Sequence, residues 1–245
     1  MLVFAHRGAS GHEPENTLLA IKQALAMQVD AIEVDVHLSD GELIVIHDRW
    51  VNKTTNGQGK INKLSFKEIR ELDAGKGQQV PTLEEVLATI NGRCHLNIEL
   101  KADQTVLPVL DLIDEAIIKY NFSYNQFLFS SFNHHLLFEI KSIKPELNIG
   151  ALTASCPLTY AEFAQHLNAY SVHINIDFIN QKFVNDAHQR GLKVFVYTVD
   201  DEDDISEMHY LGVDGIFTNY PTKSLVKIAH LNGLPLIDDS PAAFY

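Results

Sequence analysis

Short apolar runs alternate with amphipathic stretches along the whole chain, and this rhythm restricts the available folds more than any other feature. A short apolar run bounded by turn residues is typical of a buried strand, and the stretches between have the spacing of helices with one apolar face. Repeated strand–helix alternation predicts a parallel sheet, either open or closed into a barrel. The predicted strands are 2–6, 31–36, 43–47, 96–100, 127–132, 149–152, 171–176, 194–199 and 215–218. The predicted helices are 17–27, 82–90, 106–119, 134–143, 160–167, 181–190 and 203–211, with a capping box formed by Thr82 and Glu85.

The strand list contains one strand more than an eight-stranded barrel needs. The link between strands 31–36 and 43–47 contains Ser39-Asp40-Gly41, a strong turn signal, and is too short for a parallel crossover. These two strands should therefore pair antiparallel, with the first continuing above the barrel and the second folding back to bring His47 to the rim. The remaining eight strands predict an α/β protein with the TIM (β/α)8 barrel fold.

Residues 48–80 are the one long stretch that lacks this rhythm. Asn56, Gly57 and Gly59 make its start loop-like, and residues 64–72 predict one short helix. A long irregular insertion more often faces substrate than fills space. We expect a single domain, 1–245, with an insertion at about 48–80 after the second barrel strand.

Charge and cysteine content narrow the partners and the compartment. The formal net charge is −13 and no basic patch stands out, which disfavours nucleic acid and stable association with anionic membranes. Two cysteines without CxxC spacing, and no leader-like or membrane-spanning stretch, predict a cytoplasmic protein. The oligomeric state stays open, and the tail 231–245 is expected to pack beneath or beside the barrel.

Polar residues gather at the carboxyl ends of the predicted strands and on the folded-back hairpin. In a (β/α)8 barrel this end of the strands forms the active-site mouth, and residues two apart on a strand project to the same side. The residues placed there are His6, Arg7, Glu33, Asp35, His47, Glu99 and Lys101. Their coincidence at one rim predicts a functional site, although each alone has a structural reading: Glu99 and Lys101, for example, could simply neutralise one another.

The residue types at this rim suit phosphoryl chemistry. Three neighbouring carboxylates repel one another unless a cation lies among them, and Mg²⁺ or Ca²⁺ is the natural choice for oxygen ligands. Arg7 and Lys101 can bind an anionic substrate, and two histidines can exchange protons near neutral pH. His173 could face the barrel interior but is given less weight, and the acidic run 200–204 is interpreted as a solvated helix start.

Several motifs resemble the glycerophosphodiester phosphodiesterase family, in order and over residues 3–221. They are AHRGASGHEPENTLLAIKQAL, DAIEVDVHLSDGELIVIHD, NKTTNGQGKI, LDAG, VPTLEEVL, LNIELK, SSF, GLKVFVYTVD and GVDGIFTNYP. The resemblance implies a TIM barrel of the phospholipase-C-like phosphodiesterase type with a small insertion. It also implies hydrolysis of glycerophosphodiesters, such as glycerophosphocholine or glycerophosphoethanolamine, to sn-glycerol 3-phosphate and an alcohol.

The same resemblance implies roles for individual residues. His6 and His47 would be the acid–base pair, and Arg7 and Lys101 would hold the phosphate. The metal ligands for Mg²⁺ or Ca²⁺ would be Glu33, Asp35 and Glu99. The sequence does not determine which histidine starts as the base, and a slight preference goes to His47.

Two departures from the family pattern concern the substrate-facing loops. Tyr197-Thr198-Val199-Asp200 stands where the family often has Trp-Thr-Val-Asn, so Tyr197 keeps an aromatic substrate-binding wall but adds a hydroxyl. Lys53-Thr54-Thr55 replaces the family's Arg-Thr-Thr in the insertion. The alternatives are a related barrel phospholipase or lyase that releases a cyclic phosphate, and a catalytically silent barrel that binds phosphodiesters.

Overall fold

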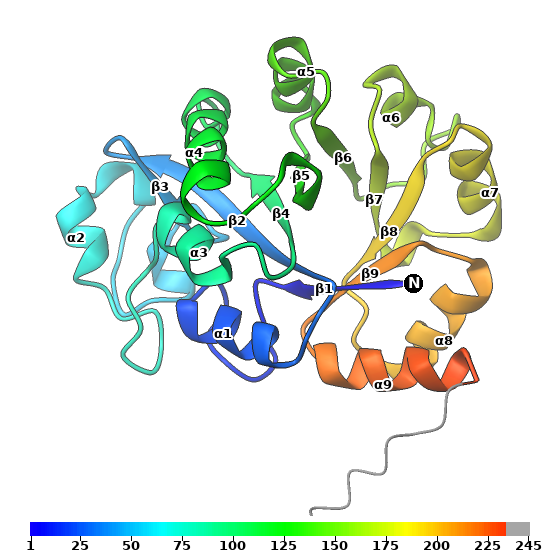
Figure 1. Ribbon diagram of the computed structural model, residues 1–245, viewed down its shortest axis with the longest axis horizontal. Coiled ribbons are helices and arrows are strands. Elements are labelled where there is room, and N and C mark those ends of the chain that lie inside the picture. Colours follow the sequence, from blue (N-terminus) through cyan, green and yellow to red (C-terminus); the bar gives the residue numbers. More distant parts are fainter. Residues whose placement is uncertain (234–245) are drawn as a thin grey trace, which may run out of the picture.

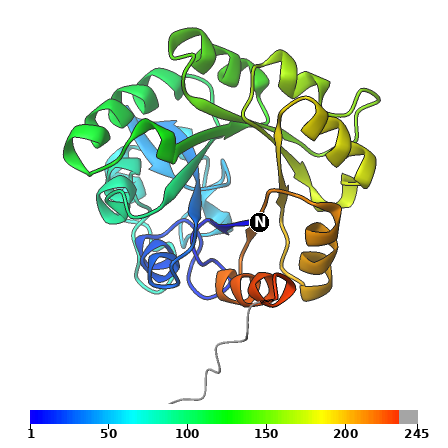
Figure 2. The same cartoon turned by 45° about the vertical axis from the view of Figure 1, so that its right-hand side comes forward.

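Eight parallel strands close into a barrel in the computed structural model, which describes residues 1–233 (Figures 1 and 2). Around the ring the order is β1-β9-β8-β7-β6-β5-β4-β2, and pairing of β1 with β2 closes it. The strands are β1 (Leu2–His6), β2 (Ala31–Ser39), β4 (His95–Leu100), β5 (Phe127–Ser131), β6 (Asn148–Thr153), β7 (Ser171–Asn175), β8 (Lys193–Tyr197) and β9 (Gly215–Thr218). The predicted TIM barrel is confirmed.

Helices between the strands surround the barrel, as Figure 2 shows. They are α1 (Leu18–Ala26), α3 (Leu83–Ile90), α4 (Val106–Lys119), α5 (His134–Ile143), α6 (Glu162–His166), α7 (Gln181–Gln189), α8 (Glu202–Leu211) and α9 (Pro221–Leu231). The capping box is present: Thr82 Oγ1 accepts from the Glu85 N–H, and the Glu85 carboxylate accepts from the Thr82 N–H. None of the helices within residues 1–233 is both long and apolar enough to cross a membrane.

One predicted helix is shorter than expected, and one helix was not predicted. The helix predicted at 160–167 shrinks to α6 because Tyr160 has φ +48° and Ala161 is a non-helical cap, so the chain turns before it coils. The helix α9 was not predicted at all, although Pro221 at its first turn is a favoured helix start. The expected packing of the tail lies outside the described residues from 234 onwards.

The second strand continues beyond the barrel and pairs with β3 (Glu42–Val45) in antiparallel register, from Val36 opposite Val45 to Ser39 opposite Glu42. The turn at its tip is formed by Asp40 and Gly41 with φ values of +52° and +81°, the left-handed pair that a tight hairpin requires. The predicted hairpin is confirmed, and β2 ends three residues later than expected because the pairing with β3 prolongs it.

The insertion after β3 packs beside the barrel with an apolar cluster of its own. It contains two 3₁₀ turns, Val51–Lys53 and Ile61–Lys63, and one short helix, α2 (Phe66–Arg70). Its buried side chains are Ile44, Ile46, Val51, Ile61, Ile69, Ala74 and Val80. The Arg70 guanidinium donates to both carboxylate oxygens of Glu85 at 2.7 Å, which anchors the insertion to α3.

The barrel interior divides into two layers along the strand direction. At the amino-terminal end of the strands, five apolar side chains fill the interior: Phe4, Ala31, Leu128, Phe195 and Phe217. Two residues further along the same strands the interior becomes polar, with His6 following Phe4 and Glu33 following Ala31. The mouth of the barrel is therefore built on a packed apolar layer.

Candidate active site

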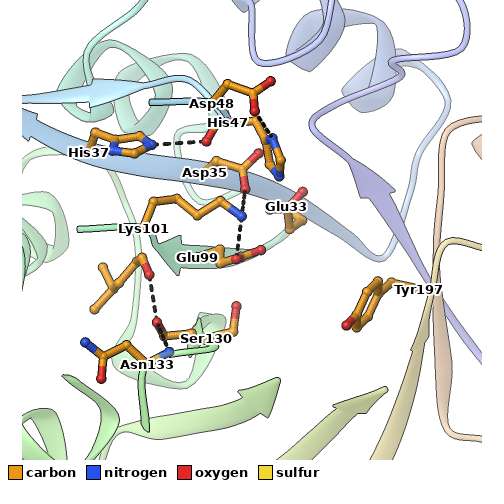
Figure 3. A network of polar contacts seen from close by, with 12 residues as sticks. Glu33, Asp35, His37, His47, Asp48, Glu99, Lys101, Ser130, Asn133 and Tyr197 are labelled. Atoms are coloured by element: carbon orange, nitrogen blue, oxygen red, sulfur yellow. Dashed lines mark hydrogen bonds and ion pairs between the residues drawn. The ribbon is translucent and has the colours of Figure 1, made fainter. Parts of the chain in front are cut away.

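Three carboxylates meet inside the mouth of the barrel. Glu33 and Asp35 come from β2 and Glu99 from β4, and the register pairs Asp35 with Glu99 directly (Figure 3). One oxygen from each can be chosen such that all lie within 4.8 Å of one another. Glu33 and Asp35 are buried, at 3% and 1% exposure. Oxygen ligands this close together form a candidate site for a hard divalent cation.

Burial and neighbouring charges shift the pKa values of all three carboxyl groups away from their ordinary values. Burial, together with Asp35 and Glu99, raises the pKa of Glu33 well above its usual value. Burial and the nearby Asp35 raise the pKa of Glu99 to about 7. Burial also opposes ionisation of Asp35, but Lys101 and Arg7 outweigh it and lower the pKa of Asp35 to about 2. The site therefore carries a negative charge at Asp35 and two carboxyls that need a further positive charge to ionise fully.

The residues present fit a metal ion. Glu33 Oε2 accepts from the Arg7 N–H at 2.9 Å, whereas Glu33 Oε1 is buried and has no hydrogen-bond partner within residues 1–233. A buried carboxylate oxygen without a partner is costly unless a ligand satisfies it. A cation among the three carboxylates would satisfy this oxygen and offset the repulsion that raises the two pKa values.

Both predicted phosphate-binding cations lie at the cluster. Lys101 Nζ is 2.6 Å from Glu99 and 3.1 Å from Asp35, as Figure 3 shows. Arg7 Nε is 3.2 Å from Asp35, and Arg7 Nη1 donates to Glu15 at 2.9 Å. Arg7 and Lys101 thus line the pocket while already paired with carboxylates. An anion that enters the pocket would share these two cations with the carboxylates.

The loop that holds Arg7 requires the glycine that follows it. Arg7 has φ +57° and Gly8 has φ +78°. A Cβ on Gly8 would lie 2.7 Å from a backbone carbon of Ala20 in α1. A left-handed backbone this close to a helix strongly favours glycine. This explains why Gly8 directly follows His6 and Arg7 in the motif.

The two histidines flank the pocket from different elements. His6 ends β1, and burial, together with the adjacent Arg7, lowers its pKa to about 4. His47 follows β3, where the Nε2–H of buried His37 donates to the His47 carbonyl at 3.1 Å. Burial also lowers the pKa of His47. The lowered pKa values favour the neutral form of both imidazoles near pH 7. A proton acceptor must start neutral, whereas a proton donor must start protonated.

One pocket of about 270 Å³ connects these residues. Its charged and titratable lining residues are His6, Arg7, Glu33, His47, Glu99 and Lys101. Its apolar and aromatic lining residues are Phe132, Leu152, Tyr197 and Phe217. The buried polar residues Asn97, Ser130 and His173 also line it. Tyr197 lies across the opening from the carboxylates in Figure 3, and its hydroxyl donates to the Thr153 carbonyl at 2.8 Å. The pocket thus has one polar and one apolar side, as a ligand with a charged centre and an organic group needs.

His173 does face the interior, although its role is not that of a free base. It is fully buried, with Nε2 2.9 Å from Ser171 Oγ, and burial lowers its pKa to about 3. Its ring packs against Gly150, where a Cβ would lie 2.2 Å from Nε2. The glycine on β6 therefore makes room for the imidazole in the barrel interior.

Sequence reasoning overlooked four residues that support this site. Asn16 Nδ2 donates to Asp35 at 2.9 Å, and Glu15 pairs with Arg7. Asn219 Oδ1 is 2.8 Å from His6 Nδ1, and Asp200 accepts from Asn219. Glu15 and Asn16 stand in the same run as His6, which was the available signal. No periodicity marks Asn219.

The interpretation of 200–204 as a solvated helix start was wrong for its first residue. Asp201 is the N-cap of α8, and Glu202, Asp203 and Asp204 occupy its first turn, as expected. Asp200 instead points back to β9, where its carboxylate accepts from Thr218 Oγ1 at 3.1 Å and from the Asn219 N–H at 2.8 Å. It belongs to the surroundings of the pocket.

The chain was also compared with known proteins. A family model described as the glycerophosphoryl diester phosphodiesterase family matches residues 6–223. A glycerophosphodiester phosphodiesterase of Caldanaerobacter subterraneus subsp. tengcongensis is 38% identical over 242 residues, covering 95% of this chain and 99% of that protein.

Two solved structures show the same architecture. A phosphodiesterase of Oleispira antarctica, in complex with the product sn-glycerol-3-phosphate, has a TM-score of 0.85 and 32% identity, covering 93% of this chain and 96% of that one. A glycerophosphodiester phosphodiesterase of Agrobacterium tumefaciens has a TM-score of 0.77 and 29% identity, covering 91% and 97%.

Proposed function

Since this chain belongs to the glycerophosphoryl diester phosphodiesterase family, it is a phosphoric diester hydrolase, and we propose that it uses a divalent cation and a histidine pair to release sn-glycerol 3-phosphate from glycerophosphodiesters. Glycerophosphocholine and glycerophosphoethanolamine are the substrates we propose to test first. The Oleispira antarctica protein, whose structure contains sn-glycerol-3-phosphate as product, supports this choice of product.

The observation that carries the proposal is the composition of a single pocket. His6, His47, Glu33 and Glu99 line the same space of about 270 Å³, with Arg7 and Lys101 beside them, and Asp35 adjoins Glu99 on the neighbouring strand. Proton donors and acceptors, cations and metal ligands are the groups that phosphodiester hydrolysis requires, and the pocket brings them together.

Glu33, Asp35 and Glu99 would hold the cation, with Mg²⁺ and Ca²⁺ as the two candidates. When bound, it would neutralise negative charge that develops on the phosphoryl oxygens. Arg7 and Lys101 would donate hydrogen bonds to the same phosphoryl group, and their ion pairs with Asp35 and Glu99 keep them in place before substrate arrives.

The histidines would exchange protons in two steps. One imidazole takes the proton of the glycerol 2-hydroxyl while the hydroxyl oxygen attacks phosphorus. The other imidazole protonates the oxygen of the departing alcohol. In the second step water opens the resulting cyclic phosphate: the second histidine takes a proton from water, and the first returns its proton to the 2-oxygen. Every proton removed is thus given back, and both imidazoles end as they began.

The test is release of glycerol 3-phosphate from glycerophosphocholine by the purified protein, before and after chelator treatment and with Mg²⁺ or Ca²⁺ added back. We expect turnover that chelator abolishes and one of the two ions restores. Accumulation of the cyclic phosphate, followed by ³¹P NMR, would instead indicate the lyase. Absence of turnover with either ion would indicate a barrel that only binds phosphodiesters.

A further inference from the structure

A chain of hydrogen bonds leads from His6 away from the pocket, through residues that follow β9 and β8. His6 Nδ1 is 2.8 Å from Asn219 Oδ1, and Asn219 Nδ2 donates to Asp200 Oδ2 at 2.7 Å. The other oxygen of Asp200 accepts from the Asn219 N–H at 2.8 Å and from Thr218 Oγ1 at 3.1 Å. Both of its oxygens are therefore occupied by donors from β9 and the loop after it.

The carboxylate of Asp200 determines which way the Asn219 amide points. An ionised carboxylate accepts hydrogen bonds and donates none, so only the NH₂ end of the amide can face it. The amide oxygen must then face His6, and Ser10 Oγ, 2.8 Å away, can donate to this same oxygen. The usual ambiguity between the two ends of an Asn side chain is thus resolved by the hydrogen-bond network.

The amide oxygen in turn determines where the proton of His6 sits. An amide oxygen can only accept, so the His6 nitrogen that faces it, Nδ1, must carry a hydrogen. In a neutral imidazole the other nitrogen, Nε2, then carries the lone pair. No hydrogen bond within residues 1–233 uses His6 Nε2, and His6 lines the pocket. The free nitrogen is therefore the one available to a substrate.

We infer that Asn219, oriented by Asp200, is the positioning residue that keeps His6 in the Nδ1–H tautomer, and that His6 is the base that takes the proton of the glycerol hydroxyl. The inference rests on the proposed function, since it names the role of one histidine in that reaction. Asp200 acts one step further away, because it touches Asn219 and not His6. The assignment of His6 as the base replaces the slight preference for His47 given by the sequence.

The surroundings of His47 suit the opposite role. Its Nδ1 lies 3.6 Å from a carboxylate oxygen of Asp48 (Figure 3). The partner of His6, in contrast, is a neutral amide. Asp48 opposes the burial that lowers the pKa of His47. Because a carboxylate stabilises an imidazolium more than an amide does, His47 is the histidine that better retains the proton the leaving alcohol needs. In the first step His6 Nε2 gains the hydroxyl proton, the bond from the 2-oxygen to phosphorus forms, the bond from phosphorus to the alcohol oxygen breaks, and His47 supplies the alcohol proton.

The positioning role is tested by removing and then exchanging the two partners of His6. Asn219→Leu deletes the acceptor, and kcat should fall about 100-fold or more while KM changes less than about 3-fold. Asp200→Asn frees the amide to flip and should have a smaller effect, about 10-fold. Asn219→Asp alone would set two carboxylates face to face. The exchange Asp200→Asn with Asn219→Asp restores an oxygen at His6 and an amide donor behind it, so kcat should recover to within about 3-fold.

Asp201→Asn is the matched control for the charge change at Asp200. It lies next along the chain, and its side chain makes no cap hydrogen bond to α8. We expect wild-type kcat and KM from this variant. If the exchange variant stays as inactive as Asn219→Leu while both remain folded by circular dichroism, the positioning role is wrong.

The tautomer itself can be read from the ring nitrogens. In protein labelled with ¹⁵N-histidine, the His6 signals are those lost in His6→Gln. We expect the Nδ1–H tautomer in the wild type and the exchange variant, and a shift toward Nε2–H in Asn219→Leu. An unchanged tautomer in Asn219→Leu would overturn the inference.

The assignment of base and acid is tested with a leaving group that needs no proton. The p-nitrophenyl ester of glycerol 3-phosphate releases a stable anion, so initial p-nitrophenolate release should depend little on the acid. His47→Ala should lose at least about 10-fold less activity on this ester than on glycerophosphocholine, whereas His6→Ala should lose equally on both. Rescue of His6→Ala in place of His47→Ala would reverse the roles. A wild-type protein that hydrolyses neither ester would contradict the proposed function itself.

Discussion

The two ends of the barrel are made from the same strands and have opposite chemistry. At the amino-terminal end, Phe4, Phe195 and Phe217 pack with ring centroids 4.6–6.5 Å apart, and a small cavity of about 90 Å³ lies beside Phe4 and Phe195. At the mouth, two residues later on β1 and β8, stand His6 and Tyr197. One step of the strand repeat thus separates a layer that stabilises the fold from the layer in which we propose that the chemistry takes place.

The difference also shows in the free energy that each end contributes. The side chains of the apolar layer are buried, so they stabilise the fold in proportion to the apolar area they remove from water. The mouth holds buried carboxyls with raised pKa values and a Glu33 oxygen that has no hydrogen-bond partner among residues 1–233. Both features lower the stability of the metal-free protein. The stabilisation from the apolar layer offsets the free energy that the buried carboxyls of the mouth cost.

The largest effect should come from the mouth. Glu33→Gln removes a proposed metal ligand while keeping an oxygen for the Arg7 N–H. Turnover of glycerophosphocholine should fall at least roughly a thousand-fold, about 4 kcal/mol of transition-state stabilisation. The free energy of unfolding of the metal-free variant at pH 8, measured in urea, should equal or exceed that of the wild type, because a source of repulsion is gone.

Glu42→Gln on β3 is its matched control, because that carboxylate is exposed. It should leave both turnover and unfolding unchanged. If Glu33→Gln lowered the free energy of unfolding as well as turnover, the proposed difference between the two ends of the barrel would be wrong.

A change at the bottom should do the reverse. Phe195→Ala empties a fully buried site between Phe4 and Phe217 and should lower the free energy of unfolding by about 3 kcal/mol, since the neighbouring rings can only partly collapse. Below its melting temperature, kcat should stay within about 3-fold of the wild type. Phe138→Ala on α5, where the ring is 62% exposed, is the control and should change stability by less than about 0.5 kcal/mol.

A smaller effect should follow from pH. The pKa of Glu99 is raised to about 7, so the native protein holds a proton that the unfolded chain has already lost above its ordinary pKa of 4.5. Glu99 therefore lowers stability progressively as pH rises from 4.5 through 7. His6, with its pKa lowered to about 4, acts in the opposite sense between pH 4 and 6.5.

The difference between wild type and Glu99→Gln isolates the contribution of Glu99. Urea unfolding in chelator at several pH values from 5 to 8 should show the wild type losing stability relative to the variant as pH rises. A difference that grows in favour of the wild type would mean that Glu99 ionises readily without metal. Metal affinity of the wild type should rise over the same range, because the ligand must lose its proton first.

The smallest effect is expected at the aromatic wall of the mouth. The Tyr197 hydroxyl is engaged by the Thr153 carbonyl, so Tyr197→Phe should cost about 1 kcal/mol of stability. The ratio of kcat/KM for glycerophosphocholine and glycerophosphoethanolamine should change by less than about 3-fold, because the ring remains in place. A large change in this ratio would show that the hydroxyl contacts the head group.

Much of the fold could be predicted because its causes are local. Apolar runs marked the strands, and Asp40-Gly41 marked the hairpin, since its turn needs two left-handed residues. The helix α9 was missed because its buried face is narrow, with only Pro221, Ser224 and Ile228 buried, and its packing against α8 and β1 supports it more than its own pattern does. Helix stability that comes from tertiary packing leaves a weak trace in the sequence.

By itself the sequence determined the repeating pattern that closes into a barrel, and it placed a histidine or a carboxylate at the ends of the right strands. What it could not contain is which side chains share a hydrogen bond across the ring. His6 and Asn219 are 213 residues apart and meet only because β1 pairs with β9 when the barrel closes. The chain of Asp200, Asn219 and His6, and the raised pKa values of Glu33 and Glu99, arise from that closure, because burial and neighbouring charges exist only in the folded protein.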